Sequence, residues 1–277
     1  MRFIFLISII VSLFVGITFG ADYSSDIIQW ISVLPPKAES DEGYSANWSN
    51  HEWQVYLDGG TVHAKLYDPN GRIGENPDFE IPQSKTTRGR ECTIKVTDGW
   101  LIGFNAGELG GSLWWFSNNG KESYKISDDQ IRGYIQKDDG LFAIEGLAHL
   151  GISEGKVIKI IENDKTGKYE SVIYSTLPEA PDAVTLDNDG SMIIATTASL
   201  IKIASDGKIK KLVEGAFWSG LYANSIVIDS QRNAYIGMRQ GIAKLSLAEA
   251  TPKIEWLIPN NSFLNEEMES YKKRRGY

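Results

Sequence analysis

Short apolar runs that alternate with polar residues recur along most of this chain and predict β-strands. Several of these runs end in an Asp-Gly pair, which is typical of a tight hairpin turn. The pairs are Asp58-Gly59, Asp98-Gly99, Asp139-Gly140 and Asp189-Gly190. Their separations of 40, 41 and 50 residues indicate an internal repeat.

A fifth unit lacks the glycine but supports the same repeat. The segment PDAVTLDNDGSMIIAT from Pro181 aligns without gaps on ANSIVIDSQRNAYIGM from Ala223, a shift of 42 residues. Each unit contains four strand-like runs, and four strands per repeat of this length are typical of β-propeller blades. A β-sandwich would show no such self-similarity. The sequence therefore predicts an all-β protein, a β-propeller of four-stranded blades.

The repeat divides the chain into segments. Five units cover 51–259, with the extra length of the third unit placed in expected loops at 146–155 and 162–169. The segment 21–50 is expected to close the ring or to form part of a sixth blade, so five and six blades both stay open. The last segment, 260–277, reads as a polar, solvated tail with a basic run at 272–275.

The first residues have the pattern of an export signal. Arg2 precedes an uncharged apolar run at 3–19, small residues follow, and Asp22 is the first acidic residue. This pattern predicts a signal peptide at 1–20 and a periplasmic or secreted protein. An uncleaved leader is the alternative, and it is the only membrane contact we expect.

Charge and cysteine content narrow the possible partners. The formal net charge is −8, which disfavours a nucleic-acid partner because phosphate backbones attract basic surfaces. Cys92 is the only cysteine, so no intrachain disulfide can form, and its place in a strand predicts a core or inter-strand thiol. The chain contains no HExxH, phosphate-loop or paired-cysteine motif.

The phrase that begins at Pro181 resembles the blade consensus of the NHL-repeat and gluconolactonase-like (senescence marker protein) β-propeller superfamily. The similarity extends over about residues 91–258. Ala183 and Ser225 stand where those blades usually have glycine, and the unit at 51–81 barely matches. A blade consensus describes how a strand turns and packs, so the resemblance implies a fold rather than an activity.

In a propeller, the innermost strands all begin on one face, which we call the upper face. Seven positions before each turn, and by alignment in the fifth unit, the chain has a polar residue: His51, Glu91, Arg132, Asp182 and Asn224. Loops expected on the same face add Glu108, Glu145, His149, Trp218, Tyr222 and Arg239. We expect these residues to form the ligand-binding face.

Two interpretations of this polar ring stay open. Channel entrances can be polar only because water fills them. Alternatively, the resemblance implies a divalent cation at the channel mouth, with Asp182 and Asn224 in matching phrases and Glu91 as a third oxygen donor by register. Ca²⁺ prefers such oxygens, whereas Arg132 in the same ring disfavours a cation. His149 is a candidate general base, or a hydrogen-bonded loop histidine.

Three functions are compatible with these observations. The leading one is an exported binding protein that engages a protein or a small ligand through its upper face, as an inhibitor or immunity factor would. The second is a metal-dependent lactonase or related ester hydrolase, in which a cation would polarise a carbonyl and activate water. The third is a structural propeller in a larger envelope assembly.

Overall fold

A computed structural model describes residues 23–249 and 252–276. The predicted signal peptide and its cleavage region therefore lie outside the described residues. None of the helices in the described ranges is long and apolar enough to cross a membrane.

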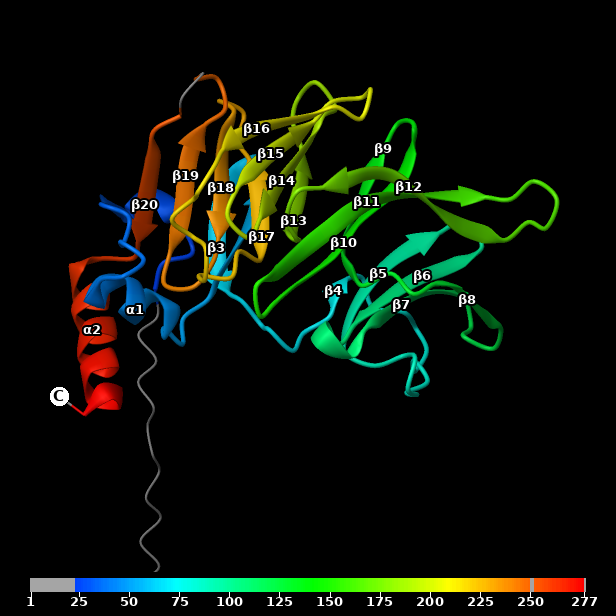
Figure 1. The fold of residues 1–277 in the computed structure, drawn as a ribbon, viewed down its shortest axis with the longest axis horizontal. Coiled ribbons are helices and arrows are strands. Elements are labelled where there is room, and N and C mark those ends of the chain that lie inside the picture. The colour runs from blue at the N-terminus through cyan, green and yellow to red at the C-terminus, as the bar shows by residue number, and fades with distance from the viewer. Residues whose placement is uncertain (1–22, 250–251, 277) are drawn as a thin grey trace, which may run out of the picture.

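Most of the described chain forms antiparallel sheets of four consecutive strands, each joined to the next by a hairpin (Figure 1). The strands are β5 (Arg90–Val96), β6 (Gly99–Asn105), β7 (Gly111–Ser117) and β8 (Ser123–Ser127); β9 (Ile131–Lys137), β10 (Gly140–His149), β11 (Ile152–Glu162) and β12 (Tyr169–Leu177); β13 (Pro181–Leu186), β14 (Met192–Thr196), β15 (Leu200–Ile203) and β16 (Ile209–Val213); and β17 (Ser225–Ile228), β18 (Asn233–Gly237), β19 (Ile242–Ser246) and β20 (Ile254–Ile258). Four-stranded meanders of this kind are propeller blades, and they confirm the predicted fold class.

The first strands of these four sheets are neighbours around one axis. Strand β5 contacts β9, β9 contacts β13, and β13 contacts β17. Each first strand ends at the turn that the repeat predicts, so the register derived from the sequence is confirmed. The residues at the start of β5, β9, β13 and β17 consequently lie near one another on the upper face.

The first predicted unit is not a complete blade. Strands β2 (Trp53–Asp58) and β3 (Thr61–Leu66) form a two-stranded sheet, and β2 packs on β17 and β18. The chain then reaches β4 (Ile73–Gly74), which pairs in parallel with β5 and so adds a strand to the inner edge of the next sheet. The described residues therefore contain four four-stranded blades and this hairpin, rather than five equal units.

The expected loop at 146–155 is the end of a long hairpin instead. Strands β10 and β11 pair from Leu141 opposite Ile160 to His149 opposite Ile152, and only Leu150 and Gly151 separate them. This hairpin extends beyond the shorter strands of its neighbours (Figure 1). The extra length of the third unit therefore lengthens strands, because alternating residues at 152–160 continue the ladder.

Both terminal segments of the described chain pack on the last blade. Strand β1 (Ile31–Val33), which follows the short 3-10 helix η1 (Ile27–Gln29), pairs antiparallel with β20 at the outer edge of that sheet. Helix α1 (Asp41–Asn47) contacts α2 (Asn261–Arg275). The N-terminal segment thus adds an outer fifth strand to the last blade.

The structure corrects the expectation of a solvated C-terminal tail. Helix α2 is capped by Asn260, whose side chain accepts a hydrogen bond from the Phe263 backbone N–H. Phe263, Glu267 and Tyr271 are buried, and their spacing of four residues places them on one helix face. The basic run lies in the exposed last turn. Positive charges there stabilise the helix, because the helix dipole is negative at its C-terminus.

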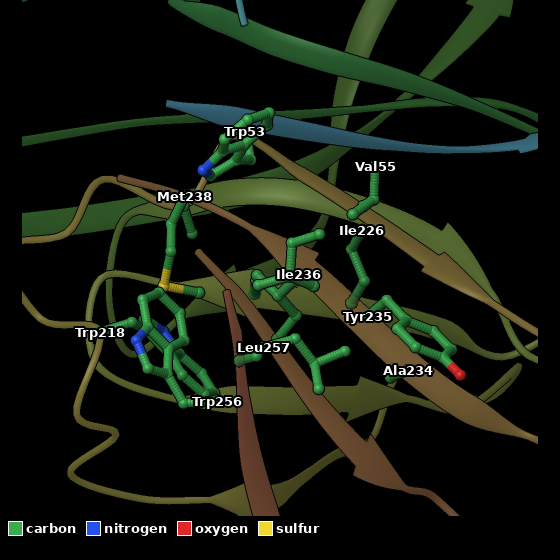
Figure 2. Packing of buried hydrophobic residues seen from close by; sticks show 14 of the residues in the cluster. Trp53, Val55, Trp218, Ile226, Ala234, Tyr235, Ile236, Met238, Trp256 and Leu257 are labelled. Atoms are coloured by element: carbon green, nitrogen blue, oxygen red, sulfur yellow. The ribbon is translucent and has the colours of Figure 1, made fainter. Parts of the chain in front are cut away.

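The largest buried cluster joins the last blade to the β2–β3 hairpin and to the helices. It includes Trp218, Trp256 and Met238, and Figure 2 shows these side chains together with Trp53. Cys92 lies in a separate cluster between β5 and its neighbours, as a core thiol should, and burial raises its pKa to about 12. These clusters fix the blades against one another.

An ion pair with a buried carboxylate links two neighbouring blades on the lower face. Arg232 occupies the turn position where the fifth unit lacks glycine, and it adopts a positive φ of 62°. Its guanidinium donates two hydrogen bonds to Asp187 of the preceding blade, at 3.1 and 2.6 Å, and Lys202 donates a third at 3.0 Å. Burial opposes ionisation of Asp187, but these hydrogen bonds outweigh it and lower its pKa.

Asp187→Asn is expected to lower the free energy of unfolding by about 2 kcal/mol near neutral pH, because charge-assisted hydrogen bonds are lost. A lowered pKa stabilises the fold above the unfolded pKa of about 4, and this contribution disappears as the pH falls through the folded pKa. Urea unfolding across this pH range should therefore show that the free energies of unfolding of the wild type and of Asp187→Asn become equal in acid. Asp189→Asn, at the exposed turn that also binds Lys202, is the control and should change stability by less than about 0.5 kcal/mol. Equal effects of both variants would contradict this account.

Candidate functional site

The inner strands surround a cavity of about 550 Å³. Its walls come from β2, β4, β9, β13 and β17. A smaller hollow of about 170 Å³ shares part of this lining, including Tyr67, and also contacts Asn105. Four charged or amide side chains line both spaces, and we call them the channel mouth: Arg90, Arg132, Asp182 and Asn224.

Register explains why these four side chains meet. Arg90 is the first residue of β5, Arg132 and Asp182 are the second residues of β9 and β13, and Asn224 directly precedes β17. All four therefore stand where an inner strand begins. Because inner strands of adjacent blades are neighbours, residues far apart in the sequence converge on one opening.

Asp182 forms an ion pair with Arg132 inside the mouth. The Arg132 Nη2 to Asp182 Oδ1 distance is 3.2 Å, and only 12% of the Asp182 side chain is exposed. Burial raises the pKa of Asp182 to about 6; the positive charge of Arg132 opposes this rise, and the nearby Glu179 adds to it. This carboxyl group can therefore change its protonation state near neutral pH.

Arg90 carries a positive charge that no carboxylate of the described residues balances by a direct ion pair. Its Nε donates to the Gly71 carbonyl at 2.9 Å, and its guanidinium lies 4.6 Å from the centre of the Tyr67 ring. Burial lowers the pKa of Arg90, and the positive charge of Arg132 adds to this effect. The mouth thus holds two guanidinium groups and one carboxylate.

Asn224 brings a free hydrogen-bond donor to the mouth. Its Oδ1 accepts a hydrogen bond from the Ser225 hydroxyl at 2.9 Å. Its Nδ2 is buried and has no hydrogen-bond partner within 23–249 and 252–276. A buried donor without a partner costs free energy. A bound molecule that accepts a hydrogen bond at this point would recover that cost.

The other two residues of the predicted ring do not line the cavity. Glu91 accepts a hydrogen bond from the Arg72 Nε at 2.7 Å and another from Gln83 at 3.3 Å. The His51 Nδ1 lies 2.7 Å from the Glu267 Oε1, and the imidazole packs against Phe263 beneath α2. His51 is thus part of the contact between the β2–β3 hairpin and helix α2.

The predicted loop residues occupy separate places on the molecule. His149 and Glu108 pair at 2.9 Å beside the tip of the β10–β11 hairpin, and neither lines the cavity. Glu145, whose pKa burial raises, lies 3.4 Å from Lys156, which also binds Asp129. These contacts are structural pairs within and between strands rather than parts of one site.

The structure corrects the placement of one predicted surface aromatic. Trp218 is buried, and its indole N–H donates to the Thr196 carbonyl at 3.1 Å. Tyr222 is exposed as expected, and the Arg239 guanidinium lies 4.1 Å from its ring centre. Arg239 also donates to Glu52 at 2.8 Å. The loop before β17 thus contributes one aromatic to the core and one to the surface.

Comparison with known proteins gives only a general likeness. No family model and no curated protein matches the chain. Among solved structures, a streptogramin B lyase is 15% identical, with a TM-score of 0.39 over 62% of this chain and 59% of that one. A gluconolactonase from Xanthomonas campestris is 14% identical, with a TM-score of 0.39 over 74% and 64%. PorZ, a surface component of the type-IX secretion system of Porphyromonas gingivalis, is 10% identical, with a TM-score of 0.41 over 75% and 31%.

The chain spans less than two thirds of the length of each of these three structures. Gluconolactonases occur among the matches, as the blade consensus suggested. At these identities the likeness concerns the fold alone.

The residues at the mouth do not fit the cation that the resemblance implied. Within the described ranges, no group of three or more His, Cys, Asp or Glu side chains is placed to hold a metal ion. Asp182 already binds Arg132, and Glu91 already binds Arg72. A cation at this point would also face the charges of two arginines. We therefore derive no step through a metal.

Arg90 of the channel mouth and Tyr67, which lines the same cavity, are the residues that sequence reasoning missed. Arg90 directly precedes Glu91, and successive residues of a strand face opposite sides of a sheet. Counting seven positions from the turn selected Glu91 and therefore passed over Arg90. The signal that would have found Arg90 is the charge at the start of β5. No repeat marks Tyr67, because it lies in the irregular connection after β3.

Proposed function

We propose that the protein is an exported β-propeller that binds a small molecule at its channel mouth. The observation that carries this proposal is the cavity of about 550 Å³ with four polar side chains at its opening. Concave sites of this volume with a few convergent polar groups are typical of small-molecule sites. Export is supported by the apolar leader at 3–19.

The shape of the mouth favours a small ligand over catalysis by the predicted histidine. His149 lies on the β10–β11 hairpin and does not line the cavity, so it cannot reach a molecule bound there without movement of that hairpin. The lactonase alternative also lacks its cation ligands, as described above. Binding without chemistry requires only the side chains that the mouth holds.

A protein partner is the second candidate, and one feature favours it. Leu109, Leu150 and Ile152 are all exposed near the pair formed by His149 and Glu108. Exposed apolar side chains grouped at a projecting hairpin are typical of contact surfaces. The two candidates use different parts of the upper face, so variants can separate them.

Retention of metabolites provides the test of the first candidate. The folded protein is incubated with a bacterial metabolite extract, washed, unfolded, and analysed by mass spectrometry for released compounds. We expect the wild type to retain at least one compound. Gly133→Leu should abolish retention, because this residue lines the cavity and a Cβ there meets its neighbours only at ordinary contact distance.

Leu150→Asp is the matched control on the hairpin tip. Leu150 already has a positive φ of 46°, a conformation that aspartate tolerates better than leucine. This variant should retain the same compound as the wild type. If Gly133→Leu retained it equally, or if only Leu150→Asp lost it, the channel mouth would not be the binding site.

A further inference from the structure

The charges around the cavity have the opposite sign to the protein as a whole. The chain has a formal net charge of −8. The cavity, however, is lined by four basic and two acidic side chains: Lys65, Arg72, Arg90, Arg132, Asp68 and Asp182. Arg72 is neutralised by Glu91 outside the lining. At the mouth itself, the charge of Arg90 remains in excess.

The existing ion pair leaves hydrogen-bonding capacity unused. One nitrogen of Arg132 contacts one oxygen of Asp182, whereas a guanidinium has five N–H donors. Arg90 uses its donors on backbone carbonyls. A carboxylate or phosphate that entered the mouth would meet two guanidinium groups, the side chain that binds both kinds of anion through charge-assisted hydrogen bonds.

A second anion cannot share this space with an ionised Asp182 at low cost, because like charges a few ångströms apart repel strongly in a buried site. Protonation of Asp182 removes the repulsion and turns its carboxyl group into a hydrogen-bond donor. Burial has already raised the pKa of Asp182 to about 6. Uptake of a proton near neutral pH therefore has a small free-energy cost.

Building on the proposed function, we propose that the ligand of the channel mouth is an anion, a carboxylate or a phosphate, held by Arg90 and Arg132. It takes the place of Asp182 on Arg132, and one proton passes from solvent to Asp182 as the anion binds. Asn224, whose Nδ2 has no hydrogen-bond partner among the described residues, borders the same opening.

The titratable and charged groups around Asp182 come from several elements, and among them Arg132 lowers its pKa and Glu179 raises it. They are Arg90 from β5, Arg132 and Tyr134 from β9, Tyr67 from the connection after β3, and Glu179 from the loop before β13. Only the two arginines are positively charged, and only Glu179 is negatively charged. An incoming anion acts with Glu179 and against the arginines, so it favours the protonated form of Asp182.

Isothermal calorimetry with succinate and succinamide tests the charge requirement, since the two molecules differ in charge but little in size. Inorganic phosphate forms a separate arm that distinguishes phosphate from carboxylate as the preferred group. We expect succinate or phosphate to bind at least about tenfold more tightly than succinamide. Arg90→Gln and Arg132→Gln should each weaken anion binding about tenfold or more, whereas Arg88→Gln, an exposed arginine outside the cavity, should not.

Proton uptake is measured by repeating the titration in buffers of different ionisation enthalpy. The wild type should take up a proton on binding near pH 7, and binding should weaken as the pH rises. Asp182→Asn should still bind the anion but without proton uptake. Asp139→Asn, in an exposed turn, should behave like the wild type.

The outcomes separate this inference from the function on which it rests. Equal binding of succinamide and succinate, or no binding of either anion at about 20 mM, would overturn the anion inference. The retention experiment with Gly133→Leu would still decide whether the mouth binds a small molecule. Anion binding without proton uptake would overturn the role given to Asp182.

Discussion

Phe263→Ala is expected to lower the free energy of unfolding by about 3–5 kcal/mol, the usual cost of removing a buried phenyl ring. Phe263 is fully buried on the inner face of α2. Its ring centre lies 5.2 Å from that of Tyr23, 5.3 Å from that of His51 and 6.2 Å from that of Trp53. The variant would leave a cavity where the N-terminal segment, the hairpin and the C-terminal helix meet. Urea unfolding monitored by tryptophan fluorescence measures the loss.

Leu264→Ala provides the comparison at the next position of the same helix. Leu264 is only partly buried, so its loss should cost about 1 kcal/mol or less. The two variants change helix propensity in a similar direction, which isolates the packing of the Phe263 ring. If both variants cost the same, α2 would contribute through its helical content and not through its docking on the blades.

Arg132→Met is expected to cost about 2 kcal/mol at about pH 8, because it leaves the buried carboxylate of Asp182 without its partner and forces it either to stay charged or to bind a proton. The cost should fall in acid. Without Arg132 the pKa of Asp182 rises further above its unfolded value, and a raised carboxyl pKa stabilises the folded state below the unfolded pKa. That contribution is lost as the pH rises through the folded pKa. The variant should therefore approach wild-type stability near pH 5.

The double variant Arg132→Met with Asp182→Asn separates this electrostatic effect from loss of packing. Once no charge is left without a partner, most of the stability at about pH 8 should return. Thermal unfolding of the four proteins across the pH range gives the coupling. A loss in Arg132→Met that is the same in acid and in base, and that the second substitution does not relieve, would show that Arg132 acts through its methylene groups alone.

Most of the fold could be predicted from the repeat, because every copy has the same turn and the same pattern of strands. An Asp-Gly turn and two alternating strands fix the register of a blade, and one gapless alignment at a shift of 42 residues then places the other strands. The prediction of a complete blade was wrong for the hairpin at 53–66, because this unit has only two strands. Helix α2 was missed because its polar surface hides the short buried series of Phe263, Glu267 and Tyr271.

The strand register also explains which residues of the site could be predicted from the sequence. Arg132, Asp182 and Asn224 occupy equivalent strand entrances, and the structure places all three at one opening. The balance of charge at the mouth could not be predicted from the sequence, since it depends on Arg90 from another blade and on burial. Trp218 was misplaced for a related reason: a loop position predicts exposure, but this loop turns inward and buries one of its aromatics.

Pairing of β1 with β20 affects how the chain reaches this structure. Ile31 lies opposite Ile258, so the earliest and latest strands of the described fold form one ladder. Contacts so distant in sequence slow folding, because a long loop must close before they form. The last sheet keeps an unpaired edge until β1 docks, and such an edge can pair with another chain. A cut in a loop between blades would, for the same reason, leave two fragments still held together by this ladder.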